Sequence, residues 1–204
     1  AGAAFPREDP RRKAVYEDGL HFDSPLSELG LASCQNFRAE GSAPQVELVA
    51  CSPLTRAVQT ASEIFGFGPA SGSDRIVTGT SVPGPLVVLE VLREFNSSVF
   101  HPSDARRRRD ELEKTFPYAN FSGVTQGIDM LLGPGIVETA EIADSRIHWL
   151  LAWLRMRPER SIACVSHGAF LRRLLAERLT PAGWRGEPRL GNMESIVVPI
   201  AFLD

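Results

Sequence analysis

Residues 46–65 read VELVACSPLTRAVQTASEIF, and this stretch decides the fold. It opens with a short, mostly apolar run of the kind that forms a buried strand. Ser52-Pro53 ends that run, and apolar residues then recur at helical spacing as far as Phe65. Arg56 falls in the first turn of the expected helix, where its guanidinium can join the free N–H groups of the helix around an anion. The stretch therefore predicts a strand followed directly by a helix, with a candidate anion site where the two meet.

A second junction of the same kind lies near the C-terminal end. Ser161–Ser166 is an apolar run that ends at His167 and Gly168, and a helix is expected over residues 169–178. In a parallel sheet the carboxyl ends of the strands share one edge, and ligands bind there. We therefore expect the two strands to be neighbouring, parallel and buried, and to place Arg56 and His167 around one pocket. Gly168 would let the backbone approach a ligand closely.

Strands and helices alternate along the rest of the chain. Each expected strand is a short continuous apolar run, which is typical of a mostly parallel sheet with helices on both faces. A final strand at Ser195–Phe202 is assigned to a sheet edge, because Pro199 cannot donate a ladder hydrogen bond. The sequence thus predicts a single α/β domain over residues 1–204, a three-layer sandwich. Its other expected elements are helices at Leu26–Glu40, Arg108–Phe116 and Thr139–Met156, a strand at Leu86–Leu92 and a long loop at Gly66–Pro85.

Composition excludes several classes of protein. With 204 residues, 43% hydrophobic and 23% charged, the chain is an ordinary globular one and long enough to bury a core. No apolar run approaches the roughly 18 residues of a membrane helix, and no signal-peptide pattern is visible. A net charge of −3 gives no general attraction to nucleic acid or to a membrane surface. Three cysteines do not make a disulfide framework, so we expect free thiols and a cytoplasmic location.

Two familiar catalytic motifs are partly present, but neither is complete. A cysteine phosphatase has five residues between its nucleophile and its arginine, whereas four separate Cys51 from Arg56. Ser166 could stand on a nucleophile elbow, but Cys164 occupies a position that the elbow reserves for glycine, and no histidine follows His167. A third interpretation, phosphoryl chemistry at an anion site that contains histidine, has the most support.

Six short patterns occur in a fixed order along the chain. They are DSPLSELG at Asp23–Gly30, SPLTRAVQTA at Ser52–Ala61, LRE at Leu92–Glu94, Glu138-Thr139 with Arg146, VSHG at Val165–Gly168 followed by Phe170–Arg172, and NME at Asn192–Glu194. Together they resemble the histidine phosphatase superfamily, the phosphoglycerate-mutase-like proteins. The resemblance runs from about Asp23 to Val198, and it implies that the edge strand is antiparallel.

A finer resemblance concerns a subgroup common in fungi, plants and protists. It is carried by Arg93-Glu94, Asp104, Phe116-Pro117 and Phe121-Ser122. The subgroup usually has a His-x-Cys-Asp-Arg-Arg run, and this chain reads HPSDAR at residues 101–106.

The resemblance implies phosphoryl transfer through a phosphohistidine. Arg56 and His167, with Gly168, would hold the phosphate. Glu94 would protonate the leaving alkoxide and then activate water, with Glu90 as the alternative acid. No cofactor and no metal are implied, and the expected partner is a phosphorylated small molecule or a phosphoprotein, not nucleic acid or membrane.

The Arg106–Arg109 run has two interpretations. It either forms a basic rim that attracts anionic substrates or is simply a solvated helix start.

One departure from the family is decisive for activity. The family's defining Arg-His-Gly, which carries the nucleophile, does not occur in this sequence. The four histidines are His21, His101, His148 and His167, and only His167 matches a family histidine, the second one. We expect Arg-His-Gly, and with it the first strand of the sheet, to lie before Ala1. A relative that truly lacks the nucleophile is the alternative.

Three functions follow from these patterns. A phosphatase acting on phosphomonoesters ranks first. A phosphoglycerate mutase ranks lower, because residues 94–98 read EFNSS where mutases of the family have Glu-Arg-His-Tyr-Gly. The third is a catalytically inactive module that binds phosphate without turning it over.

Overall fold

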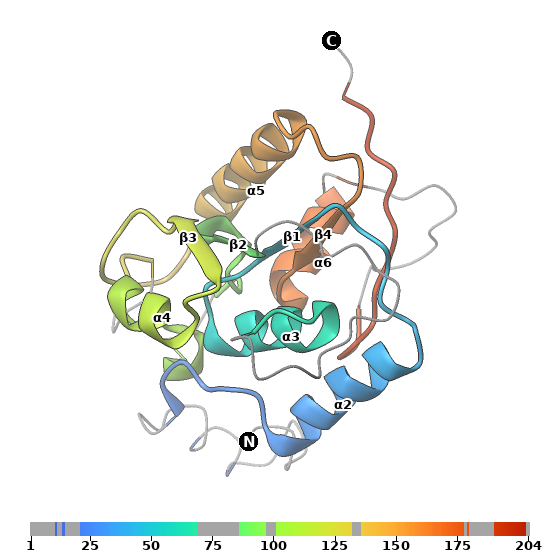
Figure 1. Cartoon of the computed structure of the whole chain (residues 1–204). Coiled ribbons are helices and arrows are strands. Elements are labelled where there is room, and N and C mark those ends of the chain that lie inside the picture. The colour runs from blue at the N-terminus through green and yellow to red at the C-terminus, as the bar shows by residue number, and fades with distance from the viewer. Residues whose placement is uncertain are drawn as a thin grey trace.

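Four parallel strands form the centre of the molecule (Figure 1). The computed structural model describes residues 11, 14, 21–68, 86–96, 101–131, 136–177, 179 and 190–202. The sheet has the order β3-β2-β1-β4, and every neighbouring pair is parallel. Cys51 lies opposite Val165, which confirms that the two strands leading to the candidate site are neighbouring and parallel. The expectation that both are buried is wrong for β4, whose residues are all partly exposed because no described strand covers its other edge. The strands are β1 (Leu48–Cys51), β2 (Leu86–Leu89), β3 (Ala119–Gly123) and β4 (Ile162–Val165).

The helices begin and end close to where the sequence predicts. The Ser27 hydroxyl accepts a hydrogen bond from the Gly30 amide and caps one helix, and Thr139 caps another through the Ile142 amide. The helix that starts after Ser52-Pro53 ends at Gly66, whose φ of 79° suits glycine. The α-helices are α2 (Glu28–Ala39), α3 (Thr55–Phe65), α4 (Arg109–Thr115), α5 (Ala140–Arg155) and α6 (Gly168–Glu177), with 3₁₀ turns η3 (Glu90–Leu92) and η4 (Pro102–Asp104).

Two apolar cores, one on each face of the sheet, confirm the three-layer arrangement. Side chains alternate along β1, so Val49 and Cys51 face one core while Ala50 faces the other. Figure 1 shows α3 and α4 on one side of the sheet and α5 on the other. The first core joins the sheet to α3 and α4 through Val58, Ala61, Leu112 and Phe116, and the second joins it to α5 and α6 through Ile147, Leu150, Phe170 and Leu174. No helix in the described ranges is long and apolar enough to span a bilayer.

The antiparallel edge strand expected at Ser195–Phe202 is not formed, and that prediction is wrong for the described chain. Residues 194–202 have no regular strand structure. Pro199 has no N–H to donate, and Val197 is 82% exposed, so neither hydrogen bonding nor burial holds this segment in the sheet.

Two other differences concern β2 and β3. The apolar run at Leu86–Leu92 is a strand only as far as Leu89, after which η3 turns the chain. The sequence does not predict β3, because its residues ANFSG are poor in strand formers. Its place depends on pairing with β2 and on Phe121, which is buried in the first core. Most of the loop expected at Gly66–Pro85 lies outside the described residues.

Candidate active site

The two strand-to-helix junctions meet at one place. β1 and β4 are neighbours, and their carboxyl ends lead to the first turns of α3 and α6. Nη2 of Arg56, in the first turn of α3, lies 3.3 Å from Nδ1 of His167, the residue just before α6. The structure therefore brings Arg56 and His167 together, as the two motifs predict.

His167 is a neutral imidazole with a defined tautomer. Burial lowers the pKa of His167 well below its ordinary value, and the positive charges of Arg56, Arg93 and Arg146 lower it further. A guanidinium can only donate, so Nδ1 accepts from Arg56. The proton of the neutral ring then sits on Nε2, which lies 2.8 Å from the Ser52 Oγ and donates to it. The imidazole thus offers one donor, at Nε2, on the side of the β1–α3 junction.

Arg56 is also held from its other side. Its Nη1 donates to the carbonyl oxygen of Ser103 at 2.5 Å, and its Nη2 donates to Oδ1 of Asp104 at 2.7 Å. The sequence shows Asp104 only as part of a subgroup pattern and does not place it in the site. No local signal could place it there, because 48 residues separate the two side chains.

Glu94 caps the helix that follows His167. Its Oε1 accepts hydrogen bonds from the amides of Ala169 and Phe170, both at 3.1 Å, and from its own neighbour Phe95 at 2.9 Å. Burial raises the pKa of Glu94. The bonds from Phe95 and Phe170 lower it, and so does the charge of Arg56, whereas Asp104 raises it. A carboxyl group with a raised pKa next to a candidate anion site is suited to proton transfer.

Glu90, the alternative acid, is engaged elsewhere. Its carboxylate accepts from Nε of Arg106 at 2.8 Å and from Nη1 of Arg93 at 3.0 Å. Asp129 completes this cluster with a 2.6 Å bond to Nη1 of Arg93. Both arginine side chains are almost fully buried. Glu90 is therefore a member of a buried ionic cluster that shapes the neighbouring loops.

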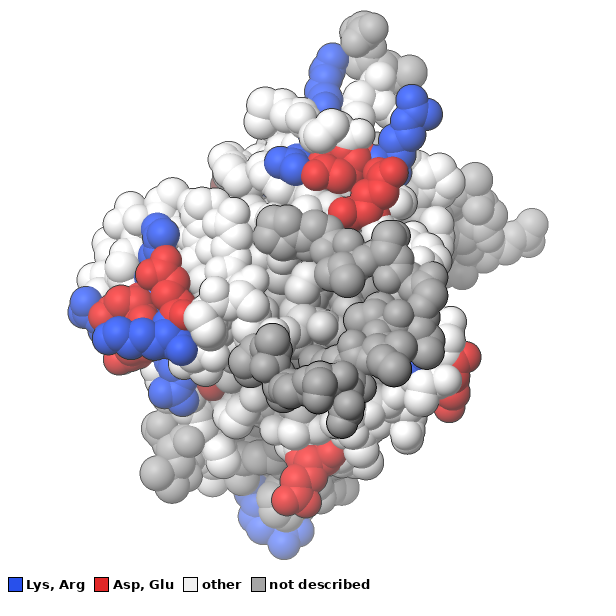
Figure 2. Space-filling view, viewed as in Figure 1, with Lys and Arg blue, Asp and Glu red and all other residues white. Residues whose placement is uncertain are grey.

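The Arg106–Arg109 run does not form a uniform basic rim. Arg106 is buried in the cluster just described, a position that neither sequence interpretation foresaw. Arg108 pairs with Asp110, and Arg109 pairs with Glu113. Figure 2 shows acidic and basic side chains side by side over α4, as expected of a solvated helix start.

Arg146 fixes the loop that carries Glu94. Its Nη1 donates to the carbonyl oxygens of Val91 and Arg93 at 2.8 and 2.9 Å. Its Nε and Nη2 make a bidentate pair with Glu138 at 2.6 and 2.8 Å, and both side chains are buried. The sequence shows Glu138 and Arg146 only as a pattern. In the structure their buried ion pair holds the Arg146 guanidinium against the backbone of the loop that carries Glu94.

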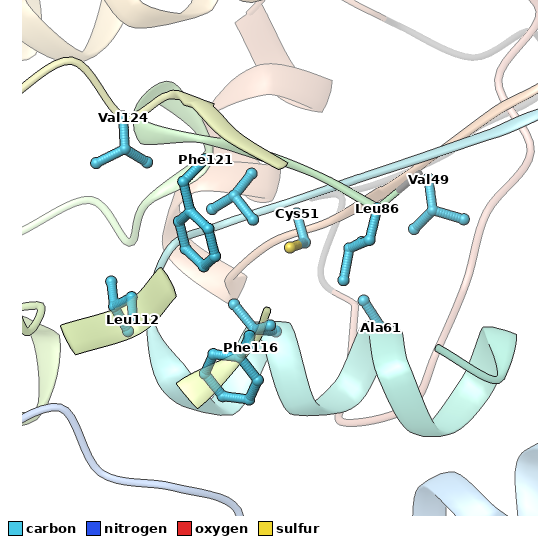
Figure 3. Close-up of a cluster of buried hydrophobic side chains, with 10 residues drawn as sticks. Val49, Cys51, Ala61, Leu86, Leu112, Phe116, Phe121 and Val124 are labelled. Carbon is cyan, nitrogen blue, oxygen red and sulfur yellow. The ribbon is translucent and has the colours of Figure 1, made fainter. Parts of the chain in front are cut away.

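The alternative nucleophiles Cys51 and Ser166 are not activated, and neither is the thiol of Cys164. Cys51 lies inside the first core beside Leu86 and Phe116 (Figure 3), and burial raises the pKa of its thiol far above the ordinary value. Partial burial likewise raises the pKa of Cys164. The Ser166 hydroxyl donates to the carbonyl oxygen of Leu92 at 2.7 Å.

Gly168 faces open space, since a Cβ built on it would meet nothing within 4 Å among the described atoms. Within the same part of the chain, no three His, Cys, Asp or Glu side chains come together in a way that could hold a metal ion.

Comparisons with known proteins identify the family of this chain. A family model of the histidine phosphatase superfamily (branch 1) matches residues 16–197. Two curated relatives from Arabidopsis thaliana are a phosphoglycerate mutase-like protein, 32% identical over 181 residues, and phosphoglycerate mutase-like protein 1, 31% identical over 175 residues. The matches cover 80% and 77% of this chain but 66% and 61% of the relatives, so the chain spans less than two thirds of their length.

Solved structures with a related shape include two phosphatases. One is the ecdysone phosphate phosphatase from Bombix mori in complex with tungstate, with a TM-score of 0.47, 16% identity and coverage of 89% of this chain and 67% of that one. The other is a mycobacterial glucosyl-3-phosphoglycerate phosphatase, with a TM-score of 0.45, 22% identity and coverage of 76% and 69%. The match of the family model over most of the chain, together with the two relatives above 30% identity, means that this protein belongs to the histidine phosphatase superfamily.

Proposed function

We propose that this chain carries the phosphate-binding and acid–base groups of a phosphatase that hydrolyses phosphomonoesters through a phosphohistidine. The observation that carries the proposal is the convergence of Arg56 and His167 at 3.3 Å at the carboxyl ends of β1 and β4. A guanidinium and an imidazole N–H are the kind of donors that a phosphate dianion needs as it becomes trigonal in the transition state. Membership of the superfamily supports the same reaction class.

Each residue has a role in the proposed reaction. Arg56 and His167 bind the phosphoryl oxygens, with the Nε2–H of His167 exchanging its Ser52 acceptor for a phosphoryl oxygen, and Gly168 leaves room for the ligand. The nucleophilic histidine attacks phosphorus while the P–O bond to the substrate breaks, and Glu94 gives its proton to the departing alkoxide. Water then attacks the phosphohistidine, the P–N bond breaks, and the Glu94 carboxylate takes the proton of that water.

The nucleophile belongs, in this proposal, to a segment outside the sequence. β4 supports this idea, because it is the last strand of the described sheet and all four of its residues are partly exposed, whereas β1 is fully buried. A strand paired with the other edge of β4 would end beside His167. The three cysteines are free thiols, which supports the cytoplasmic location that we include in the proposal.

The test is a phosphatase assay on the complete protein that contains this chain. The substrate is an aryl phosphate, EDTA is present, and the phosphoenzyme is trapped and tested for the alkali stability of phosphohistidine. We expect turnover, a trapped intermediate, and a loss of turnover of roughly 10²- to 10³-fold in His167→Ala. His148→Ala is the matched control, since His148 lies on the exposed face of α5. Phosphate binding without turnover or intermediate would favour the inactive module, and transfer to a sugar-acid phosphate instead of water would favour the mutase.

A further inference from the structure

Asp104 forms a salt bridge with Arg56, the residue that is central to the proposed site. Its Oδ1 accepts from Nη2 of Arg56 at 2.7 Å, and the carbonyl oxygen of the preceding Ser103 accepts from Nη1 at 2.5 Å. One short segment, η4, therefore holds both terminal nitrogens of the guanidinium. None of the sequence patterns assigns a role to Asp104.

The segment that carries Asp104 is itself firmly anchored. The backbone oxygen of Asp104 accepts from Nη2 of Arg93 at 2.7 Å, and Arg93 is 1% exposed and paired with Glu90 and Asp129. The carbonyl oxygen of the buried Pro102 accepts from the Asp23 amide at 3.1 Å. η4 is thus tied to the rest of the fold at both of its ends, and the carboxylate of Asp104 projects from a fixed support.

The hydrogen bond between Asp104 and Arg56 also affects His167. Nη2 of Arg56 carries two hydrogens, of which one goes to Asp104 and the other points at Nδ1 of His167. Because this donor makes Nδ1 an acceptor, the ring proton stays on Nε2, toward Ser52. The orientation of one guanidinium therefore determines the hydrogen that His167 presents.

We infer that Asp104 is a positioning residue of the phosphate site, which acts through Arg56 to aim the guanidinium and to keep His167 in the Nε2–H tautomer. The inference rests on the proposed function, because it concerns the same site. It adds a residue that neither touches the phosphoryl group nor moves a proton.

The experiment compares two variants on the full chain, with inorganic phosphate as the probe. Asp104→Asn keeps a hydrogen-bond acceptor for Arg56 and loses the charge, whereas Asp104→Ala loses both. Binding is measured by calorimetry, and the tautomer of His167 is read from the imidazole nitrogen shifts in long-range ¹H–¹⁵N NMR spectra. Asp110→Ala is the control, because Asp110 is an exposed acid on α4 that pairs with Arg108.

A positioning role predicts that Asp104→Ala binds phosphate about tenfold more weakly than Asp104→Asn. It also predicts that His167 becomes a mixture of tautomers in the alanine variant and stays Nε2–H in the asparagine variant. In an Arg56→Met background, Asp104→Ala should have no further effect on either quantity, since the contact through which it acts is gone.

Other results would overturn the inference. Equal affinities for the two variants, both tighter than wild type, would mean that Asp104 only competes with phosphate for Arg56. An unchanged His167 tautomer in Asp104→Ala would show that Arg56 needs no such support. If the alanine variant does not fold, Arg56→Met with wild-type Asp104 tests the step from Arg56 to His167 on which the inference depends: a tautomer mixture supports it, and a locked tautomer contradicts it. Failure of the wild-type protein to bind phosphate would count against the proposed function, while the tautomer comparison would still decide the role of Asp104.

Discussion

The Glu94 carboxylate accepts a hydrogen bond from the Ala169 amide, 75 residues further along the chain, at the start of the helix that follows His167. This contact places an acid and a buried imidazole at the same helix N-terminus. It also keeps the Glu94 carboxylate close to the site. The carboxylate of Glu90, by contrast, is held in a buried ionic cluster with Arg93 and Arg106.

Replacing the acid should separate chemistry from binding. In Glu94→Gln we expect turnover of an aryl phosphate to fall by about 10²- to 10⁴-fold, because proton transfer to the leaving oxygen is lost. The inhibition constant for inorganic phosphate should change little, because the amide oxygen of glutamine can still cap α6. Glu141→Gln, at the exposed first turn of α5, is the matched control. Unchanged turnover in Glu94→Gln would move the acid role elsewhere.

The pH dependence of turnover follows from the raised pKa of Glu94. Burial is the largest cause, and Asp104 adds to it. A raised pKa keeps the carboxyl protonated to a higher pH, so turnover should persist above the range of an ordinary glutamic acid before it declines. Asp104→Asn removes a negative charge that raises this pKa, and the decline should then move to lower pH. A pH–rate profile of kcat for both proteins checks the direction, and a shift to higher pH would contradict it.

The same pKa has a consequence for stability. Folded Glu94 holds its proton more tightly than the unfolded chain does, so its contribution to the free energy of unfolding is present at low pH. This contribution is lost as the pH rises through the folded pKa. Relative to Glu94→Gln, the wild-type protein should therefore lose stability as the pH rises from the ordinary glutamic acid pKa of about 4.3 through the raised folded pKa. Urea unfolding of both proteins at several pH values measures the difference.

Breaking the buried ion pair between Glu138 and Arg146 should strongly destabilise the folded protein. Glu138→Gln leaves a buried guanidinium without its counter-charge, and we expect a loss of about 3–5 kcal/mol in the free energy of unfolding. Asp110→Asn, which weakens an exposed pair, should leave the free energy of unfolding almost unchanged. Denaturant titrations compare the two. Equal losses would show that burial does not distinguish these pairs.

The contribution of β3 to stability can be tested through the buried ring of Phe121. Phe121→Ala should destabilise the protein by about 3–5 kcal/mol, because the side chain fills the first core between β3 and α4. Asn120→Ala is the control, since Asn120 is exposed on the same strand. A small effect of Phe121→Ala would mean that β3 contributes little to the core.

The sequence was a good guide wherever local pattern determines structure. The helix over Thr55–Phe65 follows from apolar spacing and from the Ser52-Pro53 start, and the pairing of β1 with β4 follows from their continuous apolar runs. Those two features suffice to bring Arg56 and His167 together.

The rest depends on contacts between distant residues. The roles of Asp104 and Arg146 exist only because chain segments about 50 residues apart come together. The strand predicted at Ser195–Phe202 does not form, because strand propensity does not say whether a neighbouring strand edge and an apolar cover are present. β3 shows the converse, since a weak strand sequence pairs where β2 offers an edge.

Arg106 shows how one side chain can organise a whole segment. Its guanidinium donates to the backbone oxygens of Arg107, Gln126 and Ile128, while its Nε reaches Glu90. Lysine has neither the reach in several directions nor enough donors to replace it. Residues 106–129 should accordingly open and close as one cooperative unit in hydrogen exchange, with their amides sharing one opening free energy. Because the same cluster anchors η4, a local opening there would release Arg56 as well, so the stability of this segment limits how long the site stays assembled.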